Sequence, residues 1–199
     1  MTRETPKFAK RVALAIAIPV VALAIFVGGR YAYNEWSGNI HVVDAGRVYR
    51  SAQLSGPEFD HVISTYGIRS ILNLRGSNPG ESWYDDEMVV SKDRSVEHYD
   101  YGISANRPVS VSQMHDILQI IQLAPKPVLL HCMGGADRAG LASALYRFSQ
   151  GVGASEASQE LCLWYGHFPY MWSRTNAMDE SFNAYAGQYK TSERRAESL

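Results

Sequence analysis

One stretch of the chain, residues 128–140, combines a candidate nucleophile with groups that bind anions. An apolar run at 128–130 predicts a short buried strand, and a glycine-containing loop then leads directly into a helix predicted over 139–149. The loop amides and the positive end of that helix can converge on one point, which makes an anion site. Cys132 begins the loop and Arg138 follows six residues later, so helix dipole and guanidinium together would favour a thiolate. The segment therefore predicts a cysteine nucleophile in a phosphate cradle, with Arg138 gripping two phosphate oxygens.

A cysteine followed by an arginine at this spacing is common by chance, so the surrounding residues carry the specificity. His131 precedes the cysteine and Gly135 follows it by three residues. We expect Gly135 where a side chain would force positive-φ strain or crowd the bound oxygens. The alternative for Cys132 is a buried, inert thiol. Cys162, the second cysteine, lies among apolar residues and is predicted to belong to the core. A disulfide between Cys132 and Cys162 is the alternative if the domain lies outside the cytoplasm.

At residues 131–140, HCMGGADRAG, the chain resembles the protein tyrosine phosphatase superfamily, in its dual-specificity-like branch. The signature of that superfamily is His-Cys, five residues, then Arg. A looser resemblance covers about residues 39–189, where RVYRSAQ at 47–53 and GIRSILNLRG at 67–76 are similar to early segments of bacterial and fungal members. The resemblance implies a phosphocysteine mechanism with Cys132 as nucleophile and Arg138 as clamp. It also implies a substrate-binding loop made of His131, Met133, Gly134, Gly135 and Ala136.

The general acid is where this chain departs from the family pattern. Many members use an Asp on a separate mobile loop, which by spacing should fall near 104–108, but this stretch reads Ser-Ala-Asn-Arg-Pro. Asp137 is the expected replacement, because some lipid-directed and bacterial members resemble this chain in placing an Asp inside the loop, and a carboxyl beside the phosphate can protonate the leaving oxygen. Asp100 is the alternative general acid, and Asp85 and Asp86 are the next candidates after it.

A second departure is Ala139, which stands where the family usually carries Ser or Thr. In family members that Ser or Thr hydroxyl eases expulsion of the thiolate when the phosphocysteine is hydrolysed. Slower turnover is therefore expected here unless another donor replaces the hydroxyl. The alternative function is therefore a phosphate-binding module with negligible turnover, a pseudophosphatase. A third hypothesis is a sulfur-transfer or arsenate-reducing enzyme, which can also use a cysteine in a loop. Arg138 at the end of the loop favours a phosphate substrate instead.

The N-terminal segment reads as a membrane element. Residues 12–29 contain no charged side chain and would span about 27 Å as a helix. A cleaved signal peptide is the alternative to a transmembrane anchor. Basic residues concentrate in segment 1–11, which predicts a cytoplasmic N-terminus and a catalytic domain on the outer, periplasmic side of the inner membrane. The remaining predicted parts are a connector over 30–38, a catalytic domain over 39–190 and a polar tail over 191–199.

Strand and helix patterns alternate through the catalytic region, which predicts an α/β fold: a mostly parallel central sheet with helices on both faces. A turn at 44–46 predicts an entering hairpin. Ser110 and Gln113 form a capping-box pattern at the start of a helix. The predicted strands cover 39–43, 47–50, 71–74, 96–101 and 128–130, and further helices cover 56–66, 82–90 and 139–149.

Composition limits the partners. The net charge of −1, with no basic cluster beyond residue 11, gives no reason to expect a nucleic-acid partner. The six histidines show no metal-ligand spacing, so neither a metal nor another cofactor is expected. Arg50 and Arg75 follow strands and are expected in surface ion pairs, with the wall of the phosphate pocket as the alternative place for each. The aromatic run from Trp164 to Trp172 is expected to form core and pocket wall, with a membrane-facing patch as the alternative. The expected substrates are phosphotyrosine proteins or, given the in-loop Asp and the tether, a lipid or lipopolysaccharide phosphate.

Overall fold

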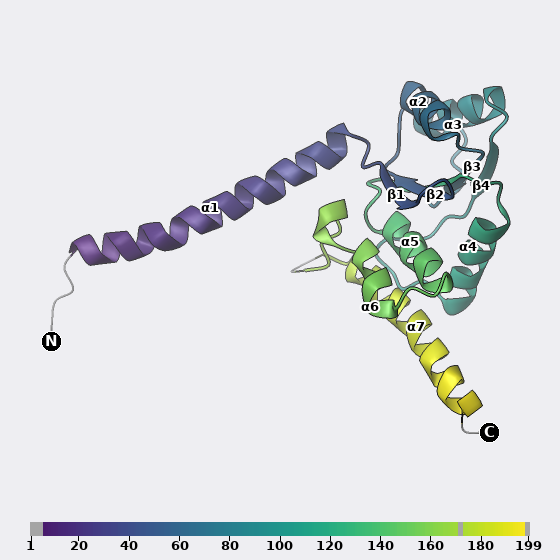
Figure 1. The fold of residues 1–199 in the computed structure, drawn as a ribbon. Helices are drawn as coiled ribbons and strands as arrows, with labels where there is room; N and C mark the ends of the chain where they lie inside the picture. The colour runs from purple at the N-terminus through teal and green to yellow at the C-terminus, as the bar shows by residue number, and fades with distance from the viewer. Residues whose placement is uncertain (1–5, 171–172, 198–199) are drawn as a thin grey trace.

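The computed structural model describes residues 6–170 and 173–197, and the chain folds as an α/β domain preceded by a long helix (Figure 1). A five-stranded sheet has the order β1-β2-β5-β3-β4. Its strands are β1 (His41–Asp44), β2 (Val48–Ser51), β3 (Ser70–Asn73), β4 (Glu97–Asp100) and β5 (Val128–His131). β1 and β2 form the predicted antiparallel hairpin, and the remaining pairs run parallel. The predicted mostly parallel sheet is therefore confirmed.

Helices cover both faces of this sheet, as predicted (Figure 1). α2 (Gly56–Tyr66) and α3 (Ser82–Asp93) pack on one face, over a core that includes Phe59, Ile71 and Leu129. α4 (Val111–Leu123), α5 (Arg138–Ser149) and α7 (Asn176–Glu197) pack on the other face, over a larger core. Because both faces are covered, β5 is buried along its whole length and delivers the residue that follows it, Cys132, to a fixed place.

The helix ends follow the local signals in the sequence. Ser110 accepts a hydrogen bond from the Gln113 amide, and the Gln113 side chain accepts one from the Ser110 amide, which is the predicted capping box. α2 begins after Ser55 with a proline in its first turn and ends at Gly67, whose left-handed backbone suits glycine. Both helices therefore start where their caps predict.

α1 (Pro6–Trp36) is longer than the apolar segment 12–29, because the helix continues through most of the predicted connector. Residues 10–36 contain a window with a mean hydropathy of 2.6, and no residue of that window is buried in the protein. By length and composition this helix can cross a membrane. Residues 1–5 of the predicted basic segment lie outside the described residues.

The part after α5 was not predicted in detail. It contains α6 (Ala154–Ala157), two short 3-10 turns, η1 (Ser158–Glu160) and η2 (Leu163–Tyr165), and α7. α7 runs to Glu197, through most of the segment predicted as a polar tail, and buries Met178, Phe182 and Tyr185 against α4 and α5. Trp172 of the predicted aromatic run lies outside the described residues.

Candidate active site

The loop that joins β5 to α5 has the tight shape expected of an anion cradle. Gly135 has φ +67°, and a Cβ there would lie 2.6 Å from the amide nitrogen of Ala52. Any side chain would therefore meet strained backbone and a steric clash together. The expected positive φ of Gly135 is confirmed, and it lets the loop turn back against the end of β2.

Arg50 holds this loop from behind. Its guanidinium donates to the carbonyl of Gly135 at 2.7 Å and to that of Ala136 at 3.0 Å, and it forms a 2.8 Å ion pair with Glu160. The Arg50 side chain is fully buried, so the expectation of a surface ion pair is wrong. β2 is an interior strand with both faces covered, which leaves an arginine on it no route to solvent. The expectation is also wrong for Arg75, which donates to Gln53 and stacks 3.4 Å over the Trp83 ring.

Two further contacts orient the same loop. The side-chain amide of Asn39 donates to the carbonyls of Gly134 and Tyr165, both at 2.8 Å, and the backbone N–H of Gln53 donates to the carbonyl of Met133. The carbonyls of residues 133–136 therefore all point outward. Within the described part of the chain, the amides of residues 133–137 donate to no protein group. Their N–H groups are left for a ligand on the inner side, as an anion cradle requires.

A cavity of about 690 Å³ lies on this inner side. Cys132 lies at its base and is 2% exposed, and Asp137 and Arg138 also line it. The structure therefore brings the predicted nucleophile, clamp and in-loop acid to one cavity. The remaining lining residues come from the predicted loop, from four other segments and from the end of α1: Tyr31, Asn34, Glu35, Asn39, Ile103, Ser104, Ala105, Asn106, Met133, Gly134, Ala136, Tyr165, Gly166 and Thr175.

Arg138 is braced on one side and open on the other. One terminal nitrogen of its guanidinium, Nη1, donates to the carbonyls of Leu74 and Ile103 at 3.3 and 3.4 Å. Its Nε is buried and has no partner in the described structure. A guanidinium fixed in this way can offer Nε and its second amino group to two oxygens of one phosphate. Burial, and then the charge of Arg138, lower the pKa of the nearby Arg75.

Asp137 takes part in a chain of three side chains, centred on the buried His167, that sequence reasoning missed. Its Oδ1 lies 2.7 Å from Nδ1 of His167, and Nε2 of His167 lies 2.8 Å from Oδ2 of Asp179. Burial opposes protonation of the ring, but the hydrogen bonds to Asp137 and Asp179 raise the pKa of His167 above its usual value. An imidazolium donates from both ring nitrogens, which suits a histidine between two carboxylates. The chain fixes one Asp137 oxygen and leaves the other for the cavity.

The other candidate acids lie elsewhere. Asp100 ends β4 and accepts hydrogen bonds from Asn73 at 2.8 Å and from Tyr84 at 2.5 Å. β4 is two strands away from β5, and Asp100 does not line the cavity. Asp85 and Asp86 are exposed on α3 and do not line it either. Of the four acids considered from the sequence, Asp137 is the one placed beside Cys132.

His131 is anchored on the opposite face of the sheet from this cavity. Its Nε2 donates to Oε1 of Glu87 at 2.8 Å, and His98 donates to the same oxygen at 2.8 Å. Gln53 donates to the other oxygen of Glu87 at 3.0 Å. Burial alone would raise the pKa of Glu87, but the charge and hydrogen bond of His131, with the bonds from His98 and Gln53, lower it to about 2. Glu87 thus fixes the residue directly before the nucleophile.

Glu87→Gln is expected to destabilise the fold by about 3 kcal/mol at neutral pH, because it leaves two buried histidines without a carboxylate. The sign follows from a pKa that folding lowers from 4.5 to about 2: the stabilisation is complete above pH 4.5 and is lost as pH falls toward 2. Denaturant unfolding at several pH values measures this. The variant should lose stability at pH 7 and show a flatter acid limb than the parent. Asp86→Asn, an exposed change on the same helix, is the matched control, and an equal loss in both would contradict the role of Glu87.

Ala139 follows the clamp at the start of α5 and is fully buried, so its methyl group supplies no donor to the loop. Cys162 is half-buried and does not line the cavity. The two cysteines are both free thiols in this structure.

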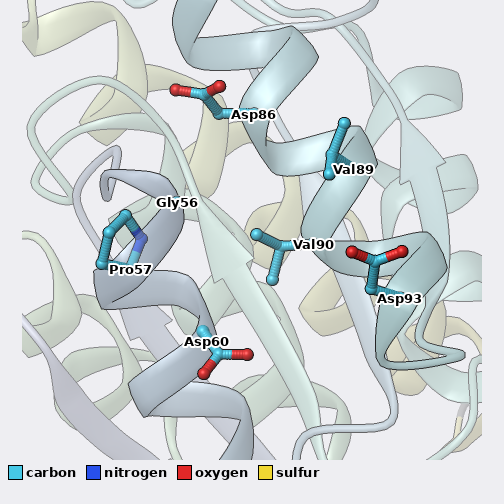
Figure 2. A pocket seen from close by; sticks show the side chains of 7 residues that line it. All are labelled: Gly56, Pro57, Asp60, Asp86, Val89, Val90 and Asp93. Atoms are coloured by element: carbon cyan, nitrogen blue, oxygen red, sulfur yellow. The ribbon is translucent and has the colours of Figure 1, made fainter.

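A second hollow, of about 400 Å³, lies between α2 and α3 on the other face of the sheet (Figure 2). Asp60 on its wall is already paired with Arg94 at 2.7 Å. No cysteine or arginine lines it. Among residues 6–170 and 173–197, no group of three or more His, Cys, Asp or Glu side chains is placed to hold a metal ion. The predicted catalytic groups therefore meet in the first cavity.

Comparison with known proteins agrees with this geometry. The model of the tyrosine phosphatase family matches residues 28–183, which include the whole sheet and the loop with Cys132 and Arg138. The chain belongs to the tyrosine phosphatase family. It is an enzyme of the protein tyrosine and dual-specificity phosphatase type, as the sequence predicted. No curated protein matches the chain.

Solved structures share the fold of this phosphatase. The active form of Tk-PTP is 25% identical, has a TM-score of 0.56 and aligns over 73% of this chain and 97% of its own. TpbA of P. aeruginosa, in complex with pTyr, is 22% identical, with a TM-score of 0.58 over 75% of this chain and 91% of its own. The catalytic core of the PP-IP phosphatase SIW14 from S. cerevisiae is 19% identical, with a TM-score of 0.58 over 78% and 93%.

Sequence reasoning missed most of the residues that support this site. Asn39 carries one signal, because it follows a glycine at the end of a helix, where an asparagine with positive φ is common. Arg50 carries another, since a charged residue on an interior strand must be paired. Glu87, His167 and Asp179 lie far from the loop in sequence and match no motif. Glu35 lines the cavity from a helix that was read as membrane anchor and connector.

Proposed function

We propose that this phosphatase hydrolyses phosphomonoesters through a phosphocysteine intermediate. The observation that carries the proposal is the meeting of Cys132, Arg138 and five loop amides that donate to no described protein group at one cavity. The amides and Arg138 hold three phosphate oxygens. The thiolate of Cys132 attacks phosphorus in line with the ester oxygen, and the P–O bond to the leaving group breaks as the S–P bond forms.

The proton for the leaving oxygen comes from Asp137. Asp137 lines the cavity, and His167 lies 2.7 Å from one of its two carboxylate oxygens. In the second step a water attacks the phosphocysteine, Asp137 takes the water's proton, and the S–P bond breaks to release inorganic phosphate and thiolate. Ala139 offers no hydroxyl to the departing sulfur, so we expect this step to limit turnover.

Hydrolysis of a soluble aryl phosphate, blocked by vanadate, tests the proposal. Orthovanadate takes a trigonal bipyramidal form that resembles the transition state, so it should bind the cradle tightly. Tight vanadate binding without measurable hydrolysis would instead support the pseudophosphatase alternative, which the buried methyl of Ala139 favours.

Asp137→Asn is expected to lower kcat by about 10²- to 10³-fold for an ester with a poor leaving group, since an amide cannot protonate it. The decrease should be much smaller for a nitrophenyl ester, whose leaving group needs no proton. Comparison of pH–rate profiles measures the effect, with Asp100→Asn as the matched control. An unchanged profile in Asp137→Asn, or loss of the same limb in Asp100→Asn, would remove Asp137 from the mechanism.

The family supports phosphotyrosine as one substrate class, and the membrane-type helix supports a phosphate carried by a lipid or lipopolysaccharide as the other. Both would place a phosphomonoester in the same cradle. Turnover of a phosphotyrosine peptide, a phosphoserine peptide and a phosphorylated lipid, compared side by side, ranks them.

We further propose that α1 stays uncleaved, anchors the chain as a single-pass protein and leaves the catalytic domain on the periplasmic side of the inner membrane. The support is the basic segment before residue 12 and the single arginine, Arg30, close behind residue 29. An alkaline phosphatase fused after residue 199 should be active, because that enzyme folds only outside the cytoplasm. An inactive alkaline phosphatase fusion, together with an active cytoplasmic reporter fused at the same place, would contradict this orientation and place the catalytic domain in the cytoplasm.

A further inference from the structure

The end of α1 and a loop of the catalytic domain are joined beside the catalytic cavity. The guanidinium of Arg30 donates to the carbonyl of Trp164 at 2.9 Å, and the side chain of Asn34 donates to the same carbonyl at 3.2 Å. The Arg30 guanidinium also stacks 3.9 Å over the Trp164 ring. Figure 1 shows the light-green loop beside the end of α1. Residues 163–170, here called the aromatic loop, are thus tied to the last turns of the membrane-type helix.

Arg30 sets the level of this loop relative to a bilayer. It is the first charged residue after the apolar segment 12–29, so it marks where the helix leaves the hydrocarbon. Since Arg30 contacts Trp164 directly, Trp164 lies at the same level. That is the depth at which tryptophan and tyrosine rings are most favourable in membranes.

The aromatic loop is also unusually apolar on its exposed side. Trp164 is 53% exposed, Phe168 43% and Tyr170 64%. Phe168 and Tyr170 pack edge to face and form one aromatic pair, which lies on the same short loop as Trp164. Large apolar side chains that gather at a surface mark an interaction site. The continuity of this patch with the end of α1 identifies the surface that covers it as the bilayer.

The catalytic cavity shares its wall with both elements. Tyr31, Asn34 and Glu35 line it from α1, and Tyr165 and Gly166 line it from the aromatic loop. Asn34 and Glu35 lie only about 6 to 8 Å beyond Arg30 along the helix axis. The headgroup layer on each side of a bilayer is about 6 Å deep. The cavity therefore lies at the outer edge of the headgroups.

We propose that the aromatic loop docks on the bilayer surface beside α1, and that the substrate is a phosphomonoester carried by a lipid of that leaflet. This inference rests on the proposed phosphatase function and names its substrate class. A headgroup phosphate reaches the level of the cavity without leaving the membrane. A folded protein domain of 100 residues, with a radius of gyration of about 13 Å, does not fit into so thin a layer.

Tryptophan quenching in the full chain tests the docking. The protein is reconstituted in phosphatidylcholine nanodiscs, with or without brominated acyl chains, as a variant that keeps only Trp164. Its fluorescence should fall at least about twofold with brominated lipid, because the ring lies at the headgroup level. A variant that keeps only Trp83, on α3 at the far side of the sheet from α5 and α7, is the matched control and should not change. Unquenched Trp164 would overturn the docking.

Activity in the same nanodiscs tests the substrate class. The double variant Phe168→Ser, Tyr170→Ser alters no residue that lines the cavity. It should lower hydrolysis of phosphatidic acid in the disc about tenfold and leave a soluble aryl phosphate unchanged, because two aromatic anchors are lost. Equal loss on both substrates would overturn the inference, and so would a phosphotyrosine peptide hydrolysed faster than phosphatidic acid. If the aryl phosphate is not hydrolysed at all while Trp164 is quenched, the proposed function fails and the docking surface stands.

Discussion

Cys132→Ser is expected to lower turnover of a soluble aryl phosphate by at least about 10⁴-fold. A serine hydroxyl at the base of the cavity does not ionise near neutral pH, and neither Arg138 nor the helix dipole can lower its proton affinity far enough. The change removes the nucleophile and little else, because the sulfur is replaced by a smaller atom and the loop is held by Arg50, Asn39 and Gln53. Steady-state kinetics measure the loss.

Binding and turnover should separate in this variant. Calorimetry should still detect binding of inorganic phosphate to Cys132→Ser, since the amides and Arg138 remain in place. Cys162→Ser is the matched control: it also removes a thiol, lies outside the cavity and should keep full activity. Residual activity of Cys132→Ser near that of the parent would show that the sulfur is not the nucleophile. Loss of activity in Cys162→Ser would indicate that the two cysteines act together.

The central elements of the fold were predictable because their signals are local. The caps Ser110 and Gln113, together with Gly67 after α2, place helix ends within a residue or two. The central strands β3 and β5 contain short apolar runs, as expected of parallel strands that are buried on both faces. The strand, loop and helix around Cys132 combine all of these signals in one stretch, and the family match confirms the reading.

The features that the sequence analysis did not predict correctly depend on contacts between segments that are distant in the sequence. Arg50 looks like any arginine after a strand, and only the position of β2 between β1 and β5 shows that it must be buried. His167 gains its two carboxylates from residues 30 positions before it and 12 positions after it, which no spacing rule covers. α7 has an apolar face that becomes evident only against α4 and α5. Tertiary packing, not local propensity, places these residues.

The end of α1 was also not predicted, because the helix extends further than its apolar composition indicates. Residues 30–36 include Arg30, Asn34 and Glu35 and were predicted to be a connector, yet the helix does not stop where the uninterrupted apolar segment ends. No glycine or proline lies between Arg30 and Trp36 to end the helix. Gly38 and Asn39 are the first residues after Arg30 with positive φ, and the helix ends just before them. A continuous helix carries Asn34 and Glu35 from the apolar segment to the cavity, so this helix and the site form one structure.

Arg138→Lys is expected to lower kcat/KM for an aryl phosphate by about 10³-fold while keeping the local charge. An ammonium is a single point of charge and cannot present two parallel N–H groups to two phosphate oxygens. Lysine also loses the brace that Nη1 of Arg138 forms with the carbonyls of Leu74 and Ile103, so its position in the cavity becomes less defined. Because the transition state spreads charge over the same oxygens, kcat should fall more than affinity for the substrate.

The measurement that separates these effects is the inhibition constant of vanadate beside kcat. In Arg138→Lys the vanadate constant should weaken in proportion to kcat/KM, whereas binding of inorganic phosphate should weaken less, since phosphate resembles the ground state. Arg94→Lys, a change of the same type at an exposed ion pair with Asp60 on α2, is the matched control and should leave both constants unchanged. Equal weakening of vanadate and phosphate would mean that Arg138 supplies only uniform binding. Parent-like kinetics in Arg138→Lys would mean that the loop amides alone hold the transition state, and the fork of Arg138 would then have no part in catalysis.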